Sequence, residues 1–145
     1  MDAYIKAYSE LTVDELYEIM QLRARVFVVE QDCVYLDLDG KDPLATHIFL
    51  KDDGVICAYA RIFGPGDYFK SASIGRVVVH SNYRGLDLGN TIVSACLTAV
   101  CDIYKTKKII ISAQKYLINF YEKHGFITRG KIYLEDGIEH ISMEI

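Results

Sequence analysis

The stretch NYRGLDLGNTIV, residues 82–93, follows a valine-rich run and leads into an apolar helical pattern. A glycine in such a connection lets a ligand approach the backbone, and the N-terminus of a helix supplies partial positive charge for an anion. The stretch has neither the Gly-Lys-Ser/Thr of a Walker loop nor three glycines at dinucleotide-binding spacing. It is therefore either an ordinary strand-to-helix connection or a phosphate cradle of another kind.

The segments before this stretch predict a helix packed beside strands. Residues 12–15 (TVDE) match a capping box, so a helix begins there, and its apolar periodicity extends to about Val29. Residues 3–9 alternate weakly, as an edge strand would. Residues 47–51 and 55–63 are apolar runs on either side of Asp-Asp-Gly, which is the signature of a β-hairpin.

The valine-rich run itself, residues 74–79, predicts a strand, and its apolar continuity suggests a central position in a sheet. A broad apolar face from Gly89 onward indicates a helix lying on that sheet. The order of elements predicts a mixed α/β fold with helices on both faces of the sheet, in one domain over residues 1–145. The later elements that we expect are a strand over 109–113, a short helix over 117–124 closed by Gly125, and a hairpin of strands over 126–134 and 139–145.

The composition excludes several classes of protein. The chain has 145 residues, 51% of them hydrophobic and 25% charged, which is a globular profile. Its formal charge of -4 comes without a basic stripe, so no nucleic-acid partner is expected. No apolar run has the length of a membrane helix, and the first residues lack the apolar core of a signal peptide, so we expect a cytoplasmic protein with no membrane partner. The four cysteines lack metal-binding spacing, which predicts reduced, mostly buried thiols, Cys33 as a small surface residue, and no metal site.

Two motifs carry a resemblance to a known family. Arg84-x-x-Asp87-x-Gly89, after a strand and before a helix, resembles motif A of the GNAT superfamily of acyl-CoA-dependent acetyltransferases. Residues 113–126 (AQKYLINFYEKHGF) resemble motif B of that superfamily and lie one helix and one strand later, as motif B does. Residues 27–31, 37–40, 74–77 and 135–141 are similar to its ElaA-like branch. The resemblance implies a GNAT-like central, mostly antiparallel twisted sheet of about six to seven strands.

The resemblance also implies acetyl-CoA as the acyl donor. In that family the strand before motif A pairs its backbone with the pantetheine arm, and the loop of motif A binds the pyrophosphate. Asp87 departs from the family pattern, which has glycine there. Aspartate tolerates a left-handed backbone, but its charge must face solvent or be offset by Arg84, so we expect weaker binding of CoA. The cofactor-binding residues implied are Val77, Val78, Val79, Arg84, Gly85, Leu86, Asp87, Leu88, Gly89, Asn90, Asn119 and Tyr121.

Acetyl transfer from a thioester to an amine requires two proton transfers, because the ammonium must lose a proton and the departing thiolate must gain one. On spacing alone, core packing is the favoured role of Tyr121. The resemblance favours a general acid instead, because Tyr121 corresponds to the tyrosine that the family places beside the thioester sulfur. Residues 73–76 carry no carboxylate, so the base is Glu30, His140 or water. Arg76 lies among apolar residues of the strand and needs an acidic partner if it is buried.

We therefore expect an N-acetyltransferase in which an amine attacks acetyl-CoA directly. The alternative is a non-catalytic module that binds or senses acyl-CoA. The acceptor would be a small-molecule or peptide amine. An acidic stretch, Asp32, Asp37, Asp39 and Asp42, would favour a cationic amine, or else it is a solvated loop. GNAT proteins are often dimers, so a homodimer is a further expectation.

Overall fold

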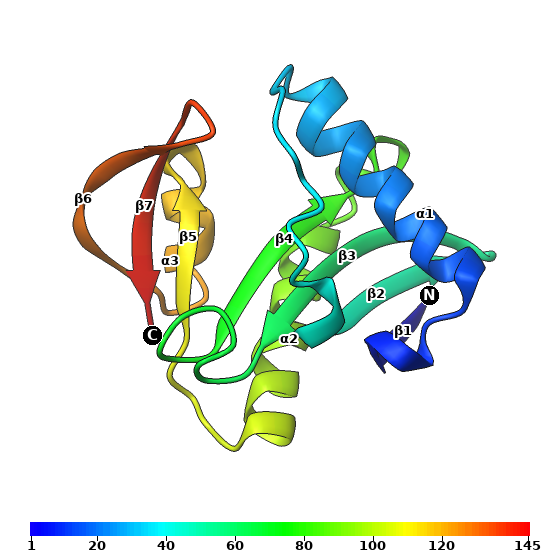
Figure 1. Cartoon of the computed structure of the whole chain (residues 1–145), viewed down its shortest axis with the longest axis horizontal. Helices are drawn as coiled ribbons and strands as arrows, with labels where there is room; N and C mark the ends of the chain where they lie inside the picture. The colour runs from blue at the N-terminus through cyan, green and yellow to red at the C-terminus, as the bar shows by residue number, and fades with distance from the viewer.

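A computed structural model describes residues 1–145 and contains seven β-strands in two sheets (Figure 1). One sheet has the strand order β1-β2-β3-β4 and the other has the order β5-β7-β6, with every neighbouring pair antiparallel. The strands are β1 (Asp2–Ala7), β2 (Thr46–Asp52), β3 (Val55–Phe63), β4 (Ser73–Val79), β5 (Ile110–Gln114), β6 (Ile127–Glu135) and β7 (Ile138–Glu144). The helices are α1 (Val13–Arg23), α2 (Leu88–Tyr104) and α3 (Ile118–Glu122), with a π-helical segment η2 (Ala24–Glu30) and short 3-10 turns η1 (Tyr8–Glu10), η3 (Asp42–Leu44), η4 (Ser81–Tyr83) and η5 (Lys115–Leu117). The predicted mixed α/β fold with a mostly antiparallel sheet is confirmed.

Helices cover both faces of the four-stranded sheet, as predicted. Successive residues of a strand point to opposite faces. Phe49 and Val78 accordingly belong to the core beneath α1, together with Ile19 and Leu22 of that helix. Ile48 and the other alternate residues belong to a larger core beneath α2. Both faces of these strands are therefore buried, which explains their continuous hydrophobic sequences.

Local sequence signals set the ends of several elements. The Thr12 hydroxyl accepts a hydrogen bond from the Glu15 amide at 3.0 Å, and the Glu15 carboxylate accepts one from the Thr12 amide at 2.9 Å, which completes the predicted capping box. The β2–β3 hairpin turns through Asp53 and Gly54, both with positive φ (48° and 80°). Gly125 ends α3 with a φ of 95°, as expected of a left-handed cap.

The position of β4 differs from the prediction. Its apolar sequence suggested a central strand, but β4 forms the edge of the four-stranded sheet and pairs only with β3. The two sheets touch through one parallel bridge between Ala72 and Ile109, where the Ile110 amide donates to the Ala72 carbonyl at 2.9 Å, and beyond that point β4 and β5 diverge (Figure 1). Burial of both faces of a strand says nothing about its edges, so apolar continuity alone does not indicate a central position. The free edge of β4 faces the opening between the sheets.

The cysteines are all free thiols, and Cys57 and Cys96 are buried in the core. Cys33 is also buried rather than at the surface, because its thiol donates to the backbone carbonyl of Asp136 at 3.3 Å and sits under the β6–β7 turn. None of the helices combines the length and hydropathy needed to cross a bilayer. No group of three or more metal-ligating side chains forms a metal site.

Candidate active site

The free edge of β4 presents backbone groups that no neighbouring strand pairs. The His80 amide donates to the Cys57 carbonyl of β3 at 2.8 Å. By the alternation of an antiparallel ladder, the backbone groups of Val77 and Val79 then point away from β3. The Val79 carbonyl does face that edge, where it accepts a hydrogen bond from Arg84 at 3.3 Å. The backbone groups of Val78 point toward β3 instead, and its side chain is buried beneath α1.

A β-bulge interrupts β4 beside this edge. The register against β3 passes from Val78 opposite Tyr59 to Gly75 opposite Arg61, so two residues of β4, Arg76 and Val77, face a single residue of β3. Arg76 has a φ of 53°, which is unusual for a non-glycine residue. The bulge turns the Arg76 side chain toward the space between the sheets, where it lines a cavity.

The loop of motif A continues from this strand into α2. Gly85 and Asp87 both have left-handed backbones, with φ of 85° and 62°, so Asp87 does adopt the conformation that a glycine would. Leu86 is exposed, whereas Leu88 is buried in the core and anchors the loop. Gly89 lies in the first turn of α2, where an added Cβ would stand 3.4 Å from the Phe120 ring of motif B. The two motifs therefore pack against each other at this point.

The charges near this loop are paired in an unexpected way. Arg84 does not offset Asp87; it forms an ion pair with Glu30 at 2.8 Å, with both side chains about half exposed. Asp87 instead accepts a hydrogen bond from the Asn90 side chain at 2.7 Å, and Asn90 accepts one from His124 at 2.8 Å. Burial lowers the pKa of His124, so the imidazole is neutral and donates to Asn90. Glu30 thus lies beside the loop of motif A.

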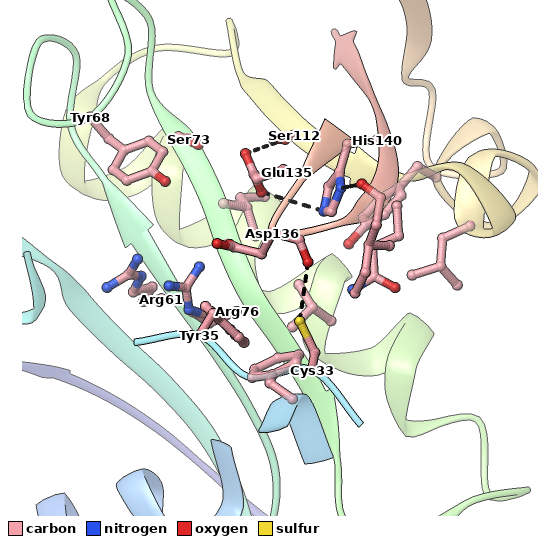
Figure 2. Close-up of a pocket in the computed structure, with 18 of the residues that line it drawn as sticks. Cys33, Tyr35, Arg61, Tyr68, Ser73, Arg76, Ser112, Glu135, Asp136 and His140 are labelled. Atoms are coloured by element: carbon pink, nitrogen blue, oxygen red, sulfur yellow. Dashed lines mark hydrogen bonds and ion pairs between the residues drawn. The ribbon is translucent and has the colours of Figure 1, made fainter. Parts of the chain in front are cut away.

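A cavity opens between the two sheets at the bulge (Figure 2). β4 and the end of β3 form one side of it, and β5, α3 and the β6–β7 hairpin form the other. Tyr121 and His140 both line this cavity, whereas Glu30 and Asn119 do not. Asn119 is exposed on α3. Of the predicted catalytic residues, the structure therefore brings two together and places the third outside.

Tyr121 has a buried ring and a free hydroxyl. The side chain is 8% exposed, and its ring packs edge-on against Phe120 and Phe126, with centroids 5.0 and 5.9 Å away. No group of the chain hydrogen-bonds the hydroxyl, and the residue lines the cavity. Burial raises the pKa of Tyr121, so the phenol keeps its proton at neutral and moderately alkaline pH. Such a group can donate a proton to an atom in the cavity.

His140 lies on the same side of the cavity as Tyr121, within a chain of polar contacts. Its Nδ1 is 2.7 Å from the Ile138 carbonyl, so Nδ1 carries a proton and donates to that oxygen. Its Nε2 faces the Glu135 carboxylate at 3.4 Å. The Ser112 hydroxyl donates to the other oxygen of Glu135 at 3.2 Å and is itself hydrogen-bonded to Tyr133. The ring of His140 is therefore fixed, and its Nε2 is the nitrogen available to exchange a proton.

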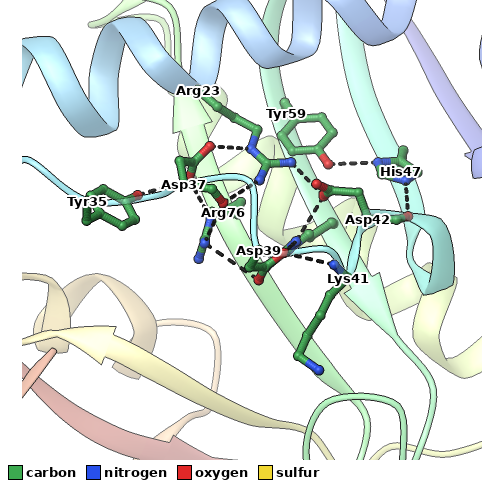
Figure 3. A network of polar contacts seen from close by, with 10 residues as sticks. Arg23, Tyr35, Asp37, Asp39, Lys41, Asp42, His47, Tyr59 and Arg76 are labelled. Carbon is green, nitrogen blue, oxygen red and sulfur yellow. Dashed lines mark hydrogen bonds and ion pairs between the residues drawn. The ribbon is translucent and has the colours of Figure 1, made fainter. Parts of the chain in front are cut away.

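The acidic stretch does not form an anionic surface for a cationic substrate. Arg23 is 1% exposed and donates to Asp37 at 2.8 Å and to Asp42 at 2.6 Å (Figure 3). Arg61 donates to Asp39 at 2.6 Å and also to Asp42 at 2.9 Å. The expectation that the acidic stretch favours a cationic amine is corrected for Asp37, Asp39 and Asp42, because arginines already pair with them, whereas Asp32 is exposed outside this network.

Arg76 is the third arginine of this network and the one nearest the cavity opening. Its Nε donates to Asp37 at 2.7 Å, and its Nη2 donates to the Asp37 carbonyl at 3.0 Å. The prediction that a buried Arg76 would need an acidic partner holds, and the partner is Asp37 rather than Glu30. Three arginines and three aspartates meet here, so their formal charges cancel.

Sequence reasoning missed Glu135, Ser112 and Arg61 as cavity residues. The sequence places Glu135 at a hairpin turn and in the stretch similar to the ElaA-like branch, but without a role in the site. The signal that existed is the alternation of β7: residues 138 and 140 share a face of that strand, and Glu135 ends the strand paired with it.

The geometry of fold and site agrees with comparisons to known proteins. A model of the acetyltransferase (GNAT) domain matches residues 6–145, so the chain belongs to the GNAT superfamily. It is similar to protein ElaA of Escherichia coli (strain K12), with 41% identity over 138 residues that cover 94% of this chain and 90% of ElaA. The crystal structure of E. coli ElaA superposes with a TM-score of 0.91 at 39% identity, covering 99% of this chain and 97% of that one. An acyl-CoA N-acyltransferase from Pseudomonas aeruginosa superposes with a TM-score of 0.93 at 38% identity, covering 99% of both chains. The predicted ElaA-like branch is thereby confirmed.

Proposed function

We propose that this protein is an N-acetyltransferase that moves the acetyl group of acetyl-CoA to an amine by direct attack. The observation that carries the proposal is that a free phenol, Tyr121, and a fixed imidazole, His140, line one cavity beside the free edge of β4. The reaction needs a proton donor for the departing sulfur and a proton acceptor for the attacking amine, and these two groups can fill those roles.

The donor would bind along β4 and the loop of motif A. The backbone groups of Val77 and Val79 at this edge, which no strand pairs, suit the amides of a pantetheine arm, in the manner of an added strand. The loop at Gly85 and the N-terminus of α2 suit the pyrophosphate, because the first turn of a helix offers free backbone N–H groups. Arg84 now contacts the Val79 carbonyl and Glu30, and it would exchange these contacts for the phosphates.

In the chemical step the amine nitrogen attacks the thioester carbon. The C–N bond forms and the C–S bond breaks, so the amine must lose one proton and the sulfur must gain one. His140 Nε2 takes the ammonium proton, with Glu135 beside it to stabilise the imidazolium, and the Tyr121 hydroxyl gives its proton to the departing thiolate. Glu30 was the other candidate base, and its position beside Arg84 assigns it to the cofactor loop in this proposal.

The test is turnover with acetyl-CoA against a broad panel of amines, followed by release of the CoA thiol and by mass of the acetylated product. We expect transfer above the rate of solvent hydrolysis, and a loss of about 10²- to 10⁴-fold in kcat for His140→Gln. The KM for acetyl-CoA should stay near the wild-type value, because His140 lies away from the β4 edge. If the protein binds acetyl-CoA but transfers it to no amine, the chain is instead a module that binds acyl-CoA.

A further inference from the structure

The wall of the cavity opposite His140 carries two arginines whose hydrogen-bonding groups are incompletely used. Arg61 is 1% exposed, and its Nη1 and Nη2 bind Asp39 and Asp42, but its buried Nε has no partner. A buried N–H without an acceptor is costly, so such groups in native proteins usually mark a place for water or a ligand. Arg61 as a residue lines the cavity, so a ligand whose acceptor atom reaches this buried nitrogen would satisfy it.

Arg76 adds a second free donor to the same wall. Its Nε and Nη2 bind Asp37, and Nη2 also lies 3.7 Å from Asp39, whereas Nη1 has no partner in the chain. Its side chain is 19% exposed, so it is reachable from the cavity. Ser73, buried next to the bulge, lines this wall as well. The aspartates hold both guanidinium groups in place and leave two N–H groups, Arg61 Nε and Arg76 Nη1, without a partner in the chain.

The other wall carries the complementary charge. Glu135 and His140 come from β6 and β7, while Arg61 and Arg76 come from β3 and β4, and Figure 2 shows the two pairs on different sides of the cavity. An ammonium group fits beside Glu135 and His140, because both accept hydrogen bonds. A carboxylate fits the arginine side, because its two oxygens match the donors of guanidinium groups.

We propose that the acceptor is a small zwitterion, an amine that carries a carboxylate close to it, as a free amino acid does. This inference rests on the proposed function, since it places the reacting amine at His140. A primary amide offers one neutral acceptor oxygen where a carboxylate offers two charged ones, and a simple amine offers none. A site built to hydrogen-bond a group discriminates strongly against analogues that lack it.

The experiment compares glycine, alanine, leucine and phenylalanine with their primary amides and with the amines that lack the carboxylate. We expect the wild-type protein to use the acids with a kcat/KM about ten- to hundredfold above that of the matched amides. Amine basicity cannot produce this preference, because an amino-acid amide has more of its amine unprotonated at neutral pH. Equal use of acids and amides would overturn the inference and leave the proposed function standing.

A variant locates the preference in the cavity. Arg76→Gln should reduce the acid-to-amide ratio of kcat/KM about tenfold or more, and Arg76→Lys should retain part of it. Arg129→Gln is the matched control, since Arg129 is an exposed arginine on β6 paired with Glu144 outside the cavity, and it should leave the ratio unchanged. A wild-type ratio in a folded Arg76→Gln would overturn the assignment of the carboxylate to this wall.

Calorimetric titration separates failure of this inference from failure of the proposed function. The protein saturated with CoA is titrated with an amino acid and with its amide, in the absence of any acyl group. Binding of the acid alone, weakened by Arg76→Gln, supports a carboxylate site even if no amine is ever acetylated. The absence of both binding and turnover for every acid in the panel would overturn the inference.

Discussion

Replacing Tyr121 with phenylalanine separates a catalytic role from a packing role. The buried ring and its contacts with Phe120 and Phe126 survive the change, and the hydroxyl that is lost has no hydrogen-bond partner in the chain. The variant should therefore lose less than about 1 kcal/mol of unfolding free energy, which is the range of a single net hydrogen bond. Its stability should be close to that of the wild-type protein.

The expected effect on the reaction is much larger. A general acid contributes about 10²- to 10⁴-fold, which corresponds to about 2.7–5.4 kcal/mol of activation free energy. The assay is single-turnover release of the CoA thiol at saturating acetyl-CoA and amine, alongside urea unfolding followed by circular dichroism. Single-turnover conditions are needed because slow product release would hide a change in the chemical step.

Tyr116→Phe provides the control for this experiment. Tyr116 precedes Tyr121 in the same motif, is 70% exposed and does not line the cavity, so the same chemical change there should alter neither rate nor stability. A Tyr121→Phe variant whose single-turnover rate lies within threefold of wild type would refute the role of Tyr121 as acid. A large loss of stability in that variant would show that the hydroxyl has a structural partner that the reasoning overlooks.

The pH dependence of the wild-type enzyme tests the same assignment. Burial raises the pKa of Tyr121 above its ordinary value, and the acid must be protonated to act, so the raised pKa extends activity toward higher pH. We expect kcat to show no alkaline decline from Tyr121 up to about pH 10, the ordinary tyrosine value. A steep decline from about pH 8, with the fold intact, would contradict this expectation.

Three further predictions concern the cofactor loop and the stability of the fold. Asp87→Gly and Asp87→Asn both keep a left-handed backbone accessible and remove a negative charge from the cofactor loop. Each variant should therefore bind CoA about three- to tenfold more tightly at low salt, measured by calorimetry, and the gain should be smaller at high salt. Unchanged affinity would mean that this charge is remote from the phosphates. Arg23→Met removes the buried cation that Asp37 and Asp42 share. The free energy of unfolding in urea should fall by about 3–5 kcal/mol, and a fall below about 1 kcal/mol would contradict a stabilising role of this ion pair. Burial opposes ionisation of Glu15, but the Thr12 amide and nearby lysines outweigh it and lower its pKa to about 2 from 4.5. Its contribution to stability should be complete above pH 4.5 and lost as the pH falls toward 2, and in Glu15→Gln the part of the pH dependence due to this group should disappear.

Much of the fold could be predicted because its signals are local. The capping box at Thr12, the Asp-Gly turn at residues 53–54 and the cap at Gly125 each depend on a few adjacent residues, and each formed where expected. The edge position of β4 could not be read in the same way. Apolar continuity reports that two faces are covered, and the free edge depends on how β5 diverges, which residues far along the chain determine.

The site was predictable only where a motif fixed it. Tyr121 and the loop of motif A follow from family spacing, whereas Glu135 enters the cavity because a hairpin turn places it beside His140. The acidic stretch illustrates the limit most clearly. Asp37 binds Arg23, 14 residues before it, and Arg76, 39 residues after it, so its sequence neighbourhood indicates a solvated loop while the fold makes it the centre of a buried network.

That network links the stability of the protein to the specificity proposed for it. Asp37, Asp39 and Asp42 cancel the charge of the arginines, so the cavity wall does not attract anions at long range. Each aspartate also occupies particular N–H groups and fixes the plane of a guanidinium, which leaves Arg61 Nε and Arg76 Nη1 as the donors without a partner in the chain. Recognition there depends on hydrogen-bond geometry more than on net charge. Raising the salt concentration should therefore weaken CoA binding at the exposed Arg84 loop more than it changes the preference for a carboxylate at the buried wall.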